Sequence, residues 1–139
     1  KTYKVDEEQL ETLKYKNFNG KILIITEPWC GDASATVPAV SKFFEGHNEV
    51  RIFYRDSDTS LIDQFLTNGT QSIPTILILN EDFSLKNVWG PRPQYGTELL
   101  KKFKENPETY PREEFYNDLQ VYYAKNKGKE AIQEILELL

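Results

Sequence analysis

An uninterrupted apolar run at residues 22–25 constrains the fold more than any other stretch of this 139-residue chain. The run is rich in β-branched residues and is bounded by Gly20 and Pro28, which is typical of a short strand. Because it does not alternate with polar residues, we expect a strand that is buried on both faces and central in its sheet. A central sheet covered by helices is the architecture of α/β domains.

Hydrophobic periodicity predicts further helices and strands on either side of this run. Helices are expected at residues 6–16, 32–45, 60–69 and about 97–104, and strands at residues 50–56, 74–80 and 85–89. A turn at residues 80–82 suggests that the last two strands form an antiparallel hairpin. The predicted fold class is therefore α/β, with a four-stranded mixed sheet flanked by helices.

The length of the chain favours one main domain, which we place at residues 1–106. The helix at 97–104 is expected to close this domain. Residues 107–139 are expected to form a C-terminal helical extension, with Pro111 in the first turn of its first helix. Because both helices of the extension carry apolar stripes, we expect them to pack on the same domain rather than on a partner.

Composition and charge exclude several classes of function. A net charge of −5, with acidic and basic residues interspersed, gives no basic surface for nucleic acid. The longest apolar run, at residues 73–79, is far shorter than the ~20 residues that cross a bilayer, so we expect no membrane partner. A single cysteine cannot close an intramolecular disulfide, which favours a reducing compartment, and we expect the cytoplasm. One cysteine and one histidine cannot form a structural zinc site, and no cofactor is expected.

Cys30, the only cysteine, stands between the central strand and the helix at 32–45. Unpaired amides at a helix N-terminus lower the pKa of a cysteine thiol from about 8.5 and favour the thiolate. Asp32 opposes this effect, because its carboxylate is expected beside the sulfur and competes for the same amides. The alternative is that Cys30 is a small buried hydrophobe. His47 is expected about 20 Å away along the helix, too far for a Cys–His dyad.

The residues around Cys30 resemble the thioredoxin family. Trp29, Cys30 and Gly31 match the start of its WCGPC motif, and Pro38 stands where that family kinks the following helix. The resemblance covers roughly residues 6–105 and implies a thioredoxin fold, with the C-terminal helices outside it.

The family's cis-proline is matched by Ile73 and Pro74 at the start of the third strand. The resemblance implies that these two residues face Cys30 across the strand ends. It also implies that the backbone of Ile73 offers an edge to an extended peptide.

Two departures from the family pattern bear on function. The motif reads WCGDA, so Ala33 stands where the family has its second, resolving cysteine. Ile24 stands where thioredoxin keeps a buried aspartate. A dithiol enzyme releases its product with the second sulfur, and this chain has none to do so.

Two functions of different classes fit this pattern. The first is monothiol thiol–disulfide exchange by Cys30 on a protein or low-molecular-weight thiol, and a redox sensor that forms a sulfenic acid is a variant of it. The second is a non-catalytic thioredoxin-fold module that binds a protein partner. The residues expected to contact a substrate are Trp29, Gly31, Asp32, Ile73 and Pro74. The sequence leaves the oligomeric state open.

Overall fold

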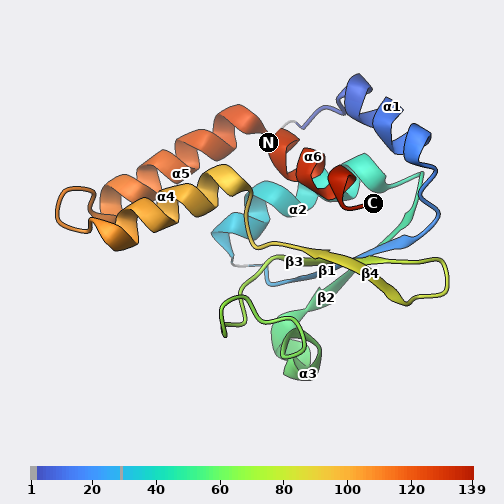
Figure 1. The fold of residues 1–139 in the computed structure, drawn as a ribbon, viewed down its shortest axis with the longest axis horizontal. Coiled ribbons are helices and arrows are strands. Elements are labelled where there is room, and N and C mark those ends of the chain that lie inside the picture. Colours follow the sequence, from blue (N-terminus) through green and yellow to red (C-terminus); the bar gives the residue numbers. More distant parts are fainter. Residues whose placement is uncertain (1–2, 29) are drawn as a thin grey trace.

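The computed structural model describes residues 3–28 and 30–139 and contains one four-stranded sheet within those residues (Figure 1). The strands are β1 (Lys21–Thr26), β2 (Glu49–Tyr54), β3 (Thr75–Leu79) and β4 (Leu85–Trp89). Their order across the sheet is β2-β1-β3-β4; β1 is parallel to β2 and antiparallel to β3, and β3 and β4 form an antiparallel hairpin. The predicted mixed sheet is confirmed, and β1 is an interior strand.

The helices are α1 (Glu7–Lys16), α2 (Gly31–Phe44), α3 (Thr59–Ile62), α4 (Gln94–Glu105), α5 (Arg112–Asn126) and α6 (Lys129–Glu137). Figure 1 shows α1, α2 and α6 over one face of the sheet and the short α3 on the other. In the same view α4 and α5 form an antiparallel pair that projects beyond the sheet. The expected flanking of the sheet by helices is confirmed.

The C-terminal helix α6 completes the main core. Ile132, Ile135 and Leu136 are fully buried, in one cluster with Ile22 and Ile24 of β1. The helix that was expected at 97–104 is part of α4. It packs with α5 in a separate cluster. Both helices have apolar stripes, so periodicity alone could not decide which of them covers the sheet.

The prediction of a helix at 60–69 is wrong in its length. The helix α3 has four residues and is capped by Asp58, whose carboxylate accepts hydrogen bonds from the Ser60 amide at 3.0 Å and the Ser60 hydroxyl at 2.7 Å. The chain then turns through Asn68 and Gly69, which both have positive φ angles. Asn-Gly is a turn-forming pair, and it forms a separate turn within the predicted helical range, six residues after the end of α3.

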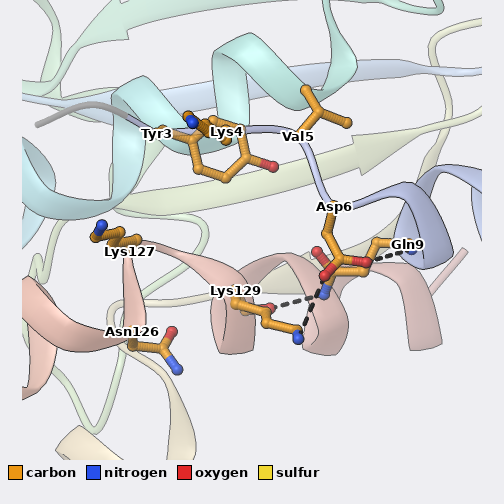
Figure 2. A pocket seen from close by; sticks show the side chains of 8 residues that line it. All are labelled: Tyr3, Lys4, Val5, Asp6, Gln9, Asn126, Lys127 and Lys129. Atoms are coloured by element: carbon orange, nitrogen blue, oxygen red, sulfur yellow. Dashed lines mark hydrogen bonds and ion pairs between the residues drawn. The ribbon is translucent and has the colours of Figure 1, made fainter.

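The helices α1 and α6 are joined by a polar contact beside a hollow of about 510 Å³ (Figure 2). The Gln9 amide nitrogen donates to the Lys129 carbonyl oxygen at 2.9 Å. The Lys129 ammonium lies 3.3 Å from the Asp6 carboxylate, which also caps α1. Among the described residues, none of the predicted site residues lines this hollow. The contact therefore holds the N-terminal end of α6 against α1.

Gly128 forms the corner between α5 and α6, where its φ is +82°. A Cβ atom there would lie 2.5 Å from the Ala39 Cβ of α2. We expect Gly128→Ala to lower the free energy of unfolding by about 2–4 kcal/mol, because strain and overlap add. Gly46 has a similar φ of +84° and no atom near its Cβ direction. Gly46→Ala should therefore lower the free energy of unfolding by only about 1 kcal/mol. Urea denaturation measures both variants, and equal losses of stability in Gly128→Ala and Gly46→Ala would contradict the packing at this corner.

Candidate functional site

Cys30 is the N-cap residue of α2 and directly follows the loop after β1. Its backbone is extended and its side chain makes no capping hydrogen bond, so it leaves the first-turn amides of α2 available. The thiol is half-buried against an apolar cluster that includes Ile25, Ile73 and Leu77. The predicted position of Cys30, between the central strand and a helix, is confirmed.

The thiol of Cys30 reaches the start of β3. Its sulfur donates a hydrogen bond to the Ile73 carbonyl oxygen at 3.6 Å. The peptide bond between Ile73 and Pro74 is cis, and both side chains are buried. A thiol is a weak hydrogen-bond donor, so a stronger donor can take its place on the carbonyl.

The first turn of α2 is open beside the sulfur. Gly31 is exposed, and a Cβ atom built on it would have no atom of the described residues within 4 Å, apart from its chain neighbours and the backbone of its own helix. None of the described residues therefore covers the Gly31 position. Trp29, which was expected to contact a substrate, lies outside the described residues.

The carboxylate of Asp32 is held in a way that the sequence did not indicate. One of its oxygens accepts a hydrogen bond from an Arg92 guanidinium nitrogen at 2.9 Å, and the other accepts one from the Tyr123 hydroxyl. The side chains of Asp32 and Arg92 are only 15% and 19% exposed. The expectation that this carboxylate competes for the first-turn amides of α2 is therefore wrong. It is engaged by groups from the loop before α4 and from α5.

Arg92 and Tyr123 are positioned by the α4–α5 pair. Gly96 leaves the space for Arg92: a Cβ atom there would lie 3.1 Å from the Arg92 Cδ and 3.2 Å from a Leu119 methyl carbon. Burial and, next, the charge of Asp32 raise the pKa of Tyr123 above its usual range. The Tyr123 hydroxyl thus remains a donor at neutral pH.

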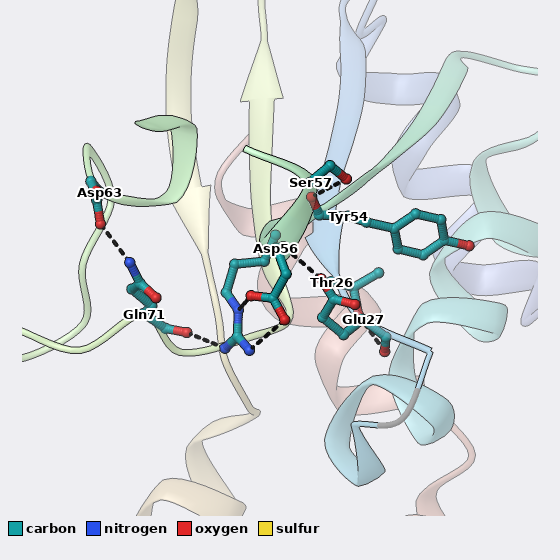
Figure 3. Close-up of polar contacts among 8 residues, drawn as sticks. Thr26, Glu27, Tyr54, Asp56, Ser57, Asp63 and Gln71 are labelled. Atoms are coloured by element: carbon teal, nitrogen blue, oxygen red, sulfur yellow. Dashed lines mark hydrogen bonds and ion pairs between the residues drawn. The ribbon is translucent and has the colours of Figure 1, made fainter. Parts of the chain in front are cut away.

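The segment before Cys30 is anchored by Glu27, which is 7% exposed. Its carboxylate accepts a hydrogen bond from the Asp56 amide at 2.6 Å, and its carbonyl oxygen accepts one from the Cys30 amide at 3.3 Å. Figure 3 shows Glu27 close to Asp56, at the ends of β1 and β2. The network continues through Arg55 to the Gln71 carbonyl, two residues before Ile73. Glu27 therefore ties the Cys30 loop to the adjacent strand ends.

Apolar side chains occupy the two positions where the chain departs from the thioredoxin pattern. Ala33 is 4% exposed and Ile24 is fully buried. His47 is exposed beyond the end of α2. Within residues 3–28 and 30–139, no three metal-ligating side chains lie close enough to hold an ion. None of the helices in this part of the chain has the length and apolar character needed to cross a bilayer.

Comparisons with known proteins agree with this fold. The family model described as thioredoxin matches residues 1–104. A solved protein of unknown function from Pseudomonas aeruginosa has a TM-score of 0.68 and 20% identity, over 97% of this chain and 74% of that chain. An HIV epitope scaffold has a TM-score of 0.71 and 20% identity, over 96% of this chain and 73% of that chain. No curated protein matches the chain.

Proposed function

Since the chain belongs to the thioredoxin family, we propose that its Cys30 thiol exchanges with mixed disulfides of proteins or low-molecular-weight thiols. The observation that carries this proposal is the position of the sulfur. It lies at the N-cap of α2, 3.6 Å from the Ile73 carbonyl oxygen, beside an open first turn. A helix N-terminus favours the thiolate, which is the reactive form of cysteine. We place this exchange in a reducing compartment such as the cytoplasm.

The exchange has two steps. In the first, the Cys30 thiolate attacks one sulfur of the mixed disulfide; that disulfide bond breaks, a new one forms to Cys30, and the other sulfur leaves as a thiolate. In the second, an external thiolate attacks the new disulfide, leaves with the transferred group as a disulfide and regenerates Cys30. A Cys30 thiolate no longer donates to Ile73, so that carbonyl becomes free to accept an amide hydrogen from an extended substrate.

The reaction stops between the two steps until an external thiol arrives. Ala33 occupies the position from which a second sulfur would attack, and Cys30 is the only cysteine in the sequence. The adduct on Cys30 is therefore expected to persist, which distinguishes this chain from dithiol members of the family.

A fluorescent peptide joined to glutathione through a disulfide tests the proposal. With glutathione as the regenerating thiol, the wild-type protein should release the peptide faster than the uncatalysed reaction. Cys30→Ser should abolish the acceleration, because it removes the attacking sulfur. Ser34→Ala, which changes an exposed side chain in the same turn, should retain it. Equal rates for wild type and Cys30→Ser would contradict monothiol exchange.

A second function, a non-catalytic binding module, is favoured by the apolar residues at positions 24 and 33. Both positions are part of the packed interior, and neither carries a group that resolves a disulfide or transfers a proton. On this alternative the wild-type protein binds a partner without exchanging thiols, and Cys30→Ser leaves binding unchanged. The peptide assay together with a binding measurement on both proteins separates the two functions.

A further inference from the structure

We propose that Arg92 is a positioning residue that neutralises Asp32 and so keeps the Cys30 thiol reactive at neutral pH. This inference rests on the proposed function, in which the thiolate is the attacking species. Asp32 follows Cys30 by two residues in the first turn of α2. An uncompensated carboxylate two residues along the chain from the cysteine would favour the protonated thiol. Arg92 supplies the opposite charge at 2.9 Å from that carboxylate.

Both partners of this ion pair are largely shielded from water. Exposed ion pairs have weak effects, because solvent screens them and long side chains move freely. Here about four-fifths of each side chain is covered, and the Arg92 chain lies in the space left by Gly96. An arginine side chain stays protonated throughout the pH range in which cysteines react. The positive charge that Arg92 places beside the Asp32 carboxylate is therefore present throughout this pH range.

The C-terminal part of the chain contributes the second contact to Asp32. Among the described residues, the titratable groups that contact this carboxylate are Arg92, from the loop before α4, and Tyr123, from α5. The next tyrosine, Tyr122, donates instead to Glu130. Glu27, on the other side of the Cys30 loop, accepts from the Asp56 backbone. Groups from the loop before α4 and from α5 thus set the charge near a thiol at the N-cap of α2.

The rate at which iodoacetamide alkylates Cys30 measures this effect without any disulfide substrate. Arg92→Gln should lower the rate at pH 7 by up to about 30-fold, which is the factor that Coulomb's law gives for unit charges on the order of 8 Å apart at an effective dielectric constant of about 20. The rate should approach the wild-type value as the pH is raised to 10, because a charge effect acts through the fraction of reactive thiolate. Asp32→Asn should raise the rate at pH 7, and the double variant should return it to near the wild-type value.

Two further variants control for the loss of charge and for damage to the fold. Arg51→Gln removes the same charge from an exposed arginine that pairs with Glu49, and it should leave the rate unchanged. Arg92→Lys keeps the charge and should stay within about twofold of wild type. Circular dichroism checks that each variant is folded.

Some outcomes would overturn the role of Arg92. One is an alkylation rate that falls equally at pH 7 and pH 10 in Arg92→Gln, which would indicate a structural effect. The other is an alkylation rate that does not rise at pH 7 in Asp32→Asn. Because alkylation needs only the thiol, this result is independent of the peptide assay. A protein that fails to exchange disulfides but shows the expected alkylation pattern would contradict the proposed function alone.

Discussion

Ala33→Cys is expected to turn a persistent mixed disulfide on Cys30 into a short-lived one. Position 33 lies in the first turn of α2, three residues after Cys30, and is 4% exposed. The introduced thiol would attack the adduct intramolecularly, and well-placed intramolecular groups act at very high effective concentrations. We expect the adduct to decay at least about 10²-fold faster than in wild type without an external thiol.

Intact-mass spectrometry of acid-quenched samples follows this decay. The glutathione adduct should be replaced by a protein that carries an internal disulfide. Ala35→Cys is the matched control, because the new sulfur lies further along the same helix, beyond the reach of a disulfide to Cys30. An adduct that persists equally in Ala33→Cys and in wild type would show that the first turn of α2 does not have the geometry described here.

Ile135→Ala should cost about 2–5 kcal/mol of the free energy of unfolding, which is typical of removing a large buried aliphatic side chain. Ile135 lies on α6, is fully buried and belongs to the same apolar cluster as β1. The substitution leaves a cavity between α6 and the sheet. Urea denaturation followed by circular dichroism measures the loss.

Val121→Ala is the control for Ile135→Ala, because Val121 lies on α5 and is 44% exposed. It should change the free energy of unfolding by less than about 0.5 kcal/mol. Equal losses for the two variants would contradict the assignment of α6 to the main core.

The parts of the fold that depend on local sequence could be predicted well. The apolar run at 22–25 indicated a central strand, and β1 is an interior strand of the sheet. The residues at 80–82 indicated the turn of the β3–β4 hairpin. Long-range packing could not be predicted in the same way. The apolar stripe of α6 led us to expect packing on the same domain, but only the tertiary structure shows that it covers the sheet beside β1.

The candidate site could likewise be predicted only in part. Cys30 and Ile73 were expected to lie together from the resemblance to the thioredoxin family, and the structure places the thiol on the Ile73 carbonyl. Arg92 and Tyr123 were missed, because they are 60 and 91 residues from Asp32 in the sequence. An arginine between two prolines and a tyrosine on an amphipathic helix carry no local signal of such a contact.

The most direct test of the central claim is the mass of the reduced, folded protein after exposure to glutathione disulfide. The account predicts one glutathione per chain, attached to Cys30, which remains after the excess reagent is removed and is released by an added thiol. A protein that stays unmodified while folded, but takes up glutathione once denatured, would show that Cys30 is a structural cysteine and would contradict the account.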